Sequence, residues 1–313
     1  MRNWLALAAT GVMALGVTAC GDDNESGGGG GSGVGDLAGN IRIDGSSTVQ
    51  PFAEAAAELF NEENSGVNVT VGGAGTGDGF EKFCRGETQI SDASRPIEED
   101  ETKLCQQGKI KPVEVQVAND GITVVTNKNL TVDCLTTGQL KKVFGKGAKA
   151  NNLSEVDPKL PDQELALFTP GTESGTFDFF TEQINGEEGV QRTEGIQTSA
   201  DDNVLVTGVS GEDGGLGYFG FSFYEQNQDK LNAVSIDGGS GCVKPSAETI
   251  QSGKYKPLAR PLFMYPSEAS LKKPEVKAFL DFVAENYAEI AEVAKIVPMN
   301  EEQASEAKSA VGG

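Results

Sequence analysis

The sequence predicts an α/β protein with two lobes, each a mainly parallel sheet flanked by helices, joined by two strands that cross between them. Strands alternate with helices along most of the chain, which is typical of α/β folds with parallel sheets. Two apolar stretches, Ile122 to Thr126 after Gly121 and the proline-flanked LARPLFMYP, are suited to cross between lobes. The 313 residues are 37% hydrophobic and include 15 Phe, which is enough to build two cores.

The N-terminus predicts export from the cytoplasm. Residues 1–19 place one basic residue before an apolar run that ends in small side chains, which is typical of a secretory signal rather than a membrane span. The stretch VTAC, ending at Cys20, resembles a bacterial lipobox, in which the signal is cleaved before an acylated cysteine. The alternative is a plain secreted protein with an incidental cysteine. The Gly-rich residues 20–39 are expected to form a flexible tether, with the fold beginning near Ile41.

Four segments of the chain share one design. IRIDGSSTVQPFAEAAAELF runs from an alternating strand through Gly, Ser and Thr into an amphipathic helix. The second segment, VNVTVGGAGTGDGFEKFC, repeats this order of elements, with a helix expected to begin near Gly79. The third segment is LALFTPGTESGTFDFF. In the fourth, ISDASRPIEEDETKLC, Ser94 and Arg95 precede Pro96, a residue favoured in the first turn of a helix.

The two crossing strands divide the chain into lobes. Residues 40–120 plus 262–313 are predicted to form lobe 1, and residues 121–261 lobe 2. A C-terminal helix belongs to lobe 1, because apolar residues recur there at helical spacing and indicate core packing rather than a site. These residues are Val276, Phe279, Leu280, Val283, Tyr287 and Ile290.

The cysteines predict two disulfides. Without Cys20, four of the five cysteines remain, an even number in an oxidising compartment. Sequence alone allows three pairings. Pairing Cys84 with Cys105 and Cys134 with Cys242 keeps each bridge within one lobe, so we favour it. A metal site is not expected, because the chain has no C-x-x-C spacing and no histidine.

The net charge of −22 argues against a nucleic-acid partner, since phosphate backbones are bound by basic surfaces. A small anion is not excluded, because local donors hold a buried anion. The first N–H groups of a helix lack partners within it and carry partial positive charge. Several Gly/Ser/Thr loops that converge at helix starts therefore predict an oxyanion site. The alternative for each single loop is ordinary N-capping.

The sequence contains no clear catalytic motif. Without histidine no Ser-His pair forms, and Ser174 lies in Gly-Thr-Glu-Ser-Gly rather than G-x-S-x-G. GGAGTGDG lacks the third glycine of a dinucleotide-binding loop. A carboxylate-pair hydrolase is not excluded by 47 acidic residues, but no spacing singles out a pair. We expect no catalysis and no cofactor.

Three stretches of the chain resemble the signatures of phosphate-binding proteins of Pst-type ABC importers: DGSSTVQPFAEAAAELF, GAGTGDGFEKFCRGETQISDASRPI and PGTESGTFDFF. The resemblance extends from about residue 40 to the end of the chain. The resemblance implies a periplasmic-binding-protein fold whose hinge closes a cleft around dehydrated phosphate, held by hydrogen bonds from both lobes. The implied ligand contacts are Ser47, Thr48 and the Val49 amide in the first loop, Thr76 in the second, Ser94 and Arg95 in the fourth, and Ser174, Gly175 and Thr176 in the third.

Two departures from the better-known members concern charge. Those members carry an Arg upstream of the Ser-Gly-Thr triplet, where this chain has Pro170, and an Asp at the position aligned with Ser94. We therefore assign the charged contact to Arg95. The carboxylate that would accept a phosphate proton is left open. The candidates are Asp78, Asp92 and Asp202, which we expect to be solvated.

The sequence thus predicts a monomeric lipoprotein outside the cytoplasm, in the periplasm or at the cell surface. It is expected to capture inorganic phosphate and deliver it to the membrane permease of an ABC importer. The alternatives are a binding protein for another tetrahedral oxyanion and, in a different class, a phosphate-ester hydrolase on the same scaffold.

Overall fold

The computed structural model describes residues 37–172 and 174–312, which lie in one compact unit, Asp36–Gly313. The strands are β1 (Gly39–Gly45), β2 (Val67–Val71), β3 (Ile90–Ala93), β4 (Val115–Asn127), β5 (Cys134–Thr136), β6 (Ala166–Pro170), β7 (Ile196–Ser199), β8 (Gly215–Gly220), β9 (Leu231–Ala233), β10 (Ser235–Asp237), β11 (Cys242–Val243) and β12 (Ala259–Pro266). The helices are α1 (Gln50–Glu63), α2 (Thr76–Cys84), α3 (Glu99–Gln107), α4 (Thr137–Phe144), α5 (Leu153–Val156), α6 (Gly175–Phe180), α7 (Asp202–Gly211), α8 (Phe221–Glu225), α9 (Ala247–Gln251), α10 (Pro274–Val293) and α11 (Glu301–Gly312), with the short helices η1 (Thr181–Asn185) and η2 (Ser270–Lys272). The proposed signal and Cys20 lie outside the described residues.

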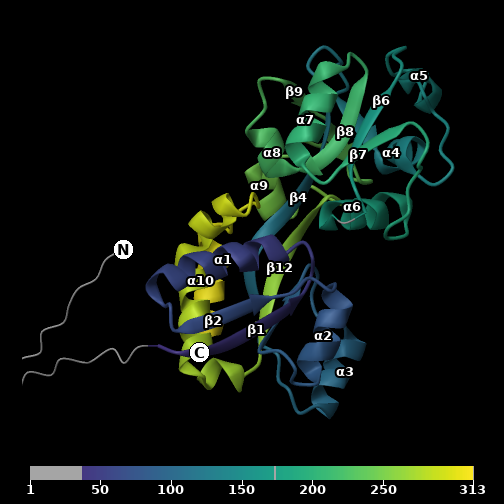
Figure 1. Cartoon of the computed structure of the whole chain (residues 1–313). Helices are drawn as coiled ribbons and strands as arrows, with labels where there is room; N and C mark the ends of the chain where they lie inside the picture. Colours follow the sequence, from purple (N-terminus) through teal and green to yellow (C-terminus); the bar gives the residue numbers. More distant parts are fainter. Residues whose placement is uncertain (1–36, 173, 313) are drawn as a thin grey trace, which may run out of the picture. The chain divides into compact units, whose positions relative to one another are not determined.

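One sheet runs through the described chain. Its strand order is β2-β1-β3-β12-β4-β8-β6-β7, with β9 paired to β4, and β11-β10-β5 form a separate small sheet. Neighbours pair in parallel in β2-β1-β3 and in β8-β6-β7. Between these two parallel groups, β12 and β4 are antiparallel to each other (Figure 1). The predicted α/β architecture with two crossing strands is confirmed.

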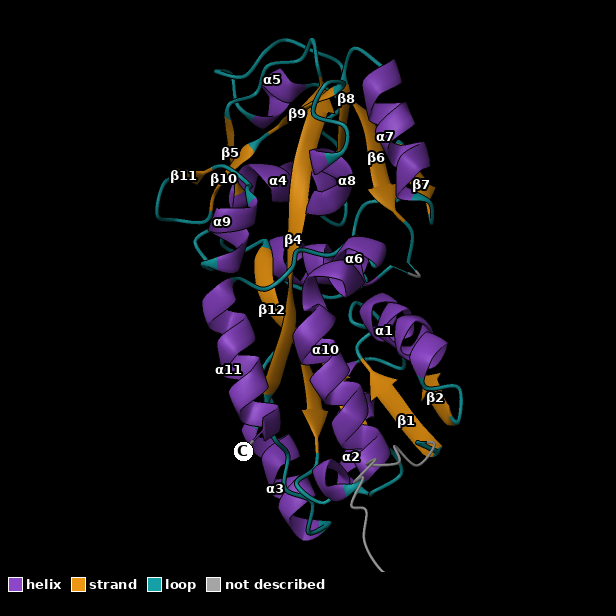
Figure 2. Ribbon diagram, turned by 90° about the vertical axis from the view of Figure 1, so that its left-hand side faces the viewer, coloured by secondary structure: helices purple, strands orange, loops and turns teal. Residues whose placement is uncertain are grey.

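Two large hydrophobic clusters lie along β4 and β12. The first core takes buried side chains from residues 41–118 and 262–311, and the second core takes them from residues 122–258 and Val297. The strand β4 contributes to both cores and extends past both groups of helices (Figure 2). The division matches the predicted lobes closely, but the lobe boundaries remain a prediction.

Helices cover both faces of the β2-β1-β3 sheet. On one face, α1, α10 and α11 bury the first core, and on the other, α2 and α3 pack around a smaller cluster. The C-terminal stripe is core, as predicted, with Phe279 and Leu280 fully buried and Tyr287 packed at the edge of the cluster. A further helix, α11, follows it and also packs on this core.

Two helices begin at residues other than those expected. α2 opens at Thr76 rather than near Gly79, because Gly75 adopts φ 104° and turns the chain into the helix three residues earlier. α3 opens at Glu99 rather than Pro96, because Glu98 and Glu101 form a reciprocal capping box. This second shift leaves Arg95 in the loop before α3, where its side chain contacts Glu98 and Glu101 at the start of that helix.

Both predicted disulfides are confirmed. Cys84 and Cys105 join α2 to α3, and Cys134 and Cys242 join β5 to β11, so each bridge stays beside one core. No helix within residues 37–172 and 174–312 combines the length and apolar character that a membrane span requires.

Candidate functional site

A cavity of about 880 Å³ opens where the ends of β1, β2 and β3 approach α6 and β12. Its walls come from both sides of the crossing strands. The residues that line it are Ser46, Ser47, Thr48, Gly73, Ala74, Gly75, Thr76, Gly77, Asp78, Ser94, Arg95, Pro96, Thr172, Gly175, Asp178, Phe179, Glu182, Gln183, Glu188, Lys256, Pro257, Ala259, Arg260 and Pro261.

Six of the nine predicted contact residues line this cavity, and three do not. The six are Ser47, Thr48, Thr76, Ser94, Arg95 and Gly175. The side chain of Val49 is buried in the first core, and its amide donates to Ser46 O at 3.1 Å. Ser174 caps α6 by accepting a hydrogen bond from the Thr176 amide at 3.2 Å. The roles of all nine in binding remain predictions.

The first loop meets the start of α6 directly. A Cβ atom placed on Gly175 would lie 2.9 Å from the Thr48 amide nitrogen and 3.0 Å from Ser47 Oγ, and closer still to Thr48 Oγ1. No side chain fits there without movement of the loop. Gly175 therefore allows hydroxyl groups beside the first core to approach the backbone beside the second core.

The second and fourth loops are linked beside this contact. Thr76 is the first residue of α2, and its hydroxyl lies 3.2 Å from the Ser94 hydroxyl. The Ser94 amide donates to Thr76 Oγ1 at 3.3 Å. Three polar loops thus present hydroxyl groups to one cavity, as the sequence pattern predicts.

Arg95 lies at the rim and is paired with carboxylates of its own segment. Its Nη1 and Nη2 donate to the two oxygens of Glu101, each at 2.9 Å, and its Nε lies 3.3 Å from Glu98. The Glu101 hydrogen bonds raise the pKa of Arg95 above its ordinary value. The side chain is 36% exposed, so the pairing is solvent-screened.

A second guanidinium, that of Arg260, lies deeper in the cavity and was missed by sequence reasoning. Its Nε donates to Asp120 Oδ2 at 3.2 Å, and its Nη2 donates to Thr48 Oγ1 at 2.7 Å and to Gly175 O at 3.3 Å. The group also lies over the Phe179 ring, 3.8 Å from the centroid. The available signal was an arginine inside the apolar, proline-flanked crossing strand.

Acidic side chains line the same cavity. Asp78 does so, as one of the candidate proton acceptors, and Asp178, Glu182 and Glu188 are additions from the structure. Burial raises the pKa of Asp178, Glu188 adds to this, and Arg260 opposes it.

The other two candidate acceptors, Asp92 and Asp202, do not line the cavity. Asp92 is fully buried with no hydrogen-bond partner for its carboxylate, so the expectation that it is solvated was wrong. Burial, and then the charge of Asp44, hold the Asp92 pKa well above its ordinary value.

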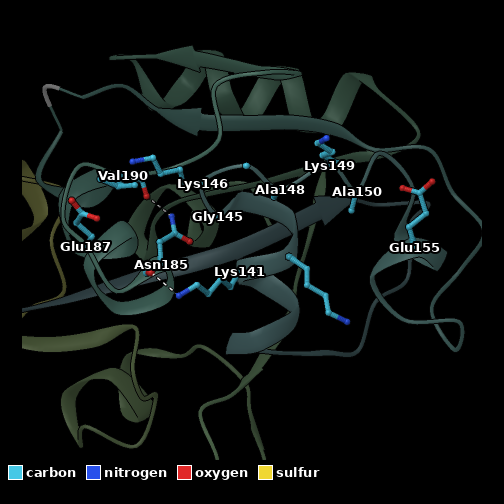
Figure 3. A pocket seen from close by; sticks show the side chains of 12 residues that line it. Lys141, Gly145, Lys146, Ala148, Lys149, Ala150, Glu155, Asn185, Glu187 and Val190 are labelled. Carbon is cyan, nitrogen blue, oxygen red and sulfur yellow. Dashed lines mark hydrogen bonds between the residues drawn. The ribbon is translucent and has the colours of Figure 1, made fainter.

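A second cavity of about 800 Å³ lies beside α4 and η1, and four lysines are among its lining residues. Figure 3 shows Lys146 and Lys149 around it, with Lys141 donating to Asn185 O at 2.8 Å. Across residues 37–172 and 174–312, no group of three His, Cys, Asp or Glu side chains is placed to hold a metal ion.

The comparison with known proteins agrees with this geometry. The family model described as "PBP superfamily domain" matches residues 30–286. Protein SphX of Synechococcus elongatus is 44% identical over 262 residues, covering 83% of this chain and 77% of SphX. The phosphate-binding protein PstS of Staphylococcus saprophyticus is 40% identical, covering 99% of this chain and 94% of PstS.

A solved structure of a similar protein has the same fold. The crystal structure of a possible phosphate binding protein from Planctomyces limnophilus superposes with a TM-score of 0.83 at 41% identity, covering 88% of this chain and 98% of that protein. The fold and the cavity define a substrate-binding protein of the periplasmic-binding type. The chain belongs to the PBP superfamily and, within it, to the family of PstS-type phosphate-binding proteins.

Proposed function

We propose that this chain binds inorganic phosphate in the cavity between its two cores and delivers it to an ABC importer. The observation that carries the proposal is the contact of Gly175 with Ser47 and Thr48, which joins donor groups from both sides of the crossing strands. The name of the 40% identical PstS, a phosphate-binding protein, supports the choice of ligand.

The cavity offers the chemistry that a dehydrated oxyanion requires. Hydroxyl groups of Ser47, Thr48, Thr76 and Ser94 are rotatable donors, and the start of α2 adds backbone N–H groups with partial positive charge. Formal positive charge comes from guanidinium groups, which hold two phosphate oxygens through a planar fork. Arg95 is proposed to contribute from the rim by exchanging part of its Glu101 contact for the anion.

The remaining contacts come from the third loop. Ser174, Gly175 and Thr176 are proposed to close on the anion when lobe 2, residues 121–261, moves toward lobe 1, residues 40–120 plus 262–313. The crossing strands β4 and β12 would act as the hinge. Phosphate is then expected to lower the radius of gyration and to raise the melting temperature by mass action.

The location and assembly state are also part of the proposal. The signal-like residues 1–19 and the lipobox-like sequence before Cys20 favour an exported protein anchored by lipid at Cys20. A monomer is proposed. Mass spectrometry of the protein from membranes checks the anchor, since lipidation adds the mass of acyl groups to a peptide that begins at Cys20.

Calorimetry and an activity assay separate the proposal from its alternatives. A binding protein gives saturable heat with phosphate and no turnover of p-nitrophenyl phosphate. Saturable binding of sulfate but not phosphate would favour another oxyanion, whereas sustained release of p-nitrophenol would favour a hydrolase. The absence of histidine in the chain leaves no Ser-His pair to support such turnover.

A further inference from the structure

Three cations line the cavity between the two cores, Arg95, Lys256 and Arg260, and the guanidinium of Arg260 is the least exposed of them. Its side chain is 13% exposed, compared with 36% for Arg95. Lys256, the third cation of the lining, is exposed. Because water screens exposed charges, a buried guanidinium interacts more strongly with a dehydrated anion.

The surroundings of Arg260 fix its orientation from several elements. In the pairing of β12 with β4, Arg260 lies opposite Asp120, whose side chain is 10% exposed and accepts from Nε. The ring of Phe179, in α6, lies against the guanidinium plane. These contacts hold Nε and one face of the group, while Nη2 donates to Thr48 and Gly175, which both line the cavity.

The two acceptors of Nη2 lie on opposite sides of the crossing strands. Thr48 follows β1 beside the first core, and Gly175 opens α6 beside the second core. Both belong to the loops proposed to contact phosphate. Arg260 itself lies on β12, which crosses between the cores, so its guanidinium is already at the meeting point of the two loops.

We propose that Arg260 is the principal charged phosphate ligand of this chain and that it couples the anion to the approach of the two cores. This inference rests on the proposed phosphate function. The anion accepts hydrogen bonds from the Nη groups in place of Gly175 O, and Thr48 turns its hydroxyl proton toward the same anion. The hinge-strand arginine thereby supplies the charge that Pro170 cannot provide from the second core.

The direct carboxylate contacts of the two arginines favour Arg260 over Arg95 for this role. Arg95 is already held by both oxygens of Glu101 and lies close to Glu98. Arg260 has a single carboxylate in hydrogen-bond contact, through one nitrogen only, while Glu182 and Asp178 act on it through their charge. Burial lowers the pKa of Arg260 from its ordinary value while Asp120 opposes this, and an arginine remains charged regardless. A buried cation with one monodentate partner has donors left for an anion.

The test compares variants of Arg260 by calorimetry with inorganic phosphate, with the melting temperature measured without ligand. Arg260→Gln is expected to weaken phosphate binding at least 30-fold. Arg260→Lys keeps the charge but loses the fork, so it is expected to recover only part of the loss. Lys146→Gln removes one positive charge outside the cavity and is the matched control, with binding expected within twofold of wild type.

The outcomes separate this inference from the proposed function. If wild type does not bind phosphate, the proposed function fails. If wild type binds and Arg260→Gln binds within threefold of it, the Arg260 inference is overturned while the function stands. If Arg260→Gln does not fold, Thr48→Val tests the same contact with little change of shape. Wild-type affinity and an unchanged phosphate-induced decrease in radius of gyration in that variant would also overturn the inference.

Discussion

Replacement of Gly175 by Ala separates ligand binding from folding. The new methyl group would lie 2.9 Å from the Thr48 amide nitrogen and 3.0 Å from Ser47 Oγ. Rotation of the Thr48 side chain relieves only its hydroxyl contact, because the amide nitrogen belongs to the backbone. The first loop and α6 must therefore move apart by several tenths of an ångström. Overpacking of this kind costs about 1–3 kcal/mol.

We assign that cost to the bound state. The contact joins groups beside different cores, so a small separation along the crossing strands relieves it without disturbing either core. Alanine also has a higher helix propensity than glycine and restricts the unfolded chain more. Each effect stabilises the folded protein by up to about 1 kcal/mol. We expect Gly175→Ala to weaken phosphate binding by about 5- to 150-fold while the ligand-free melting temperature is unchanged or raised.

The assay is calorimetry with phosphate, accompanied by differential scanning calorimetry without ligand. The matched control is Gly138→Ala, in the first turn of α4, where the nearest atom to a new Cβ is Thr136 Oγ1 at 3.8 Å. This control changes helix propensity without touching the cavity. A Gly175→Ala protein that binds phosphate within twofold of wild type would refute the reasoning, because the two loops would not then meet in the bound state.

Three further predictions concern charge and covalent links. Burial beside Asp201 raises the Asp202 pKa to about 6. The folded state therefore disfavours its ionised form, and this group lowers stability as pH rises from about 4 to 6. In urea denaturation at pH 7.5, Asp202→Asn should raise the free energy of unfolding by about 1–2 kcal/mol over wild type, a value that allows for solvent screening. At pH 4 the increase should be small, and equal increases at both pH values would contradict this prediction. The disulfide Cys134–Cys242 spans 108 residues. A variant with Ser at both positions should therefore have a free energy of unfolding lower by roughly 5 kcal/mol in the same assay. A loss under 1 kcal/mol would count against the chain-entropy account. Arg95→Ala should weaken phosphate binding about tenfold, near 1.4 kcal/mol, and an unchanged Kd would leave Arg95 a surface ion pair.

Local sequence patterns were sufficient to predict the strand–loop–helix units. The Gly/Ser/Thr loops precede α1, α2 and α6, and their composition can be read within a few residues. Of these three helices, only α6 is capped by a side chain, that of Ser174. Cysteine pairing followed from the two crossing strands, since only one pairing keeps each bridge on one side of them. These features depend on short-range chemistry or on a coarse division of the chain.

Long-range register was not available from local patterns. Arg260 meets Asp120, 140 residues away in sequence, only because β12 pairs antiparallel with β4 in one particular register. The start of α3 illustrates competition between local signals. Pro96 favours a first helical turn, but the reciprocal cap of Glu98 and Glu101 moves the start to Glu99 and places Arg95 within reach of Glu101.

The buried carboxylate of Asp92 shows the same limit. Its sequence neighbours gave no indication that β3 would lie between β1 and β12, which buries the side chain completely. An acidic residue in a short strand was expected to be solvated because charged groups are rarely buried without a partner. Its raised pKa is the physical consequence of that burial.

Calorimetric titration of the purified chain, residues 37–313, with inorganic phosphate tests the central claim most directly. We predict saturable binding with one phosphate per chain. Gly175→Ala and Arg260→Gln are each expected to weaken this binding, whereas Gly138→Ala and Lys146→Gln are not. Wild-type protein that remains folded but shows no saturable heat up to millimolar phosphate, a limit near −4 kcal/mol of binding free energy, would contradict the account.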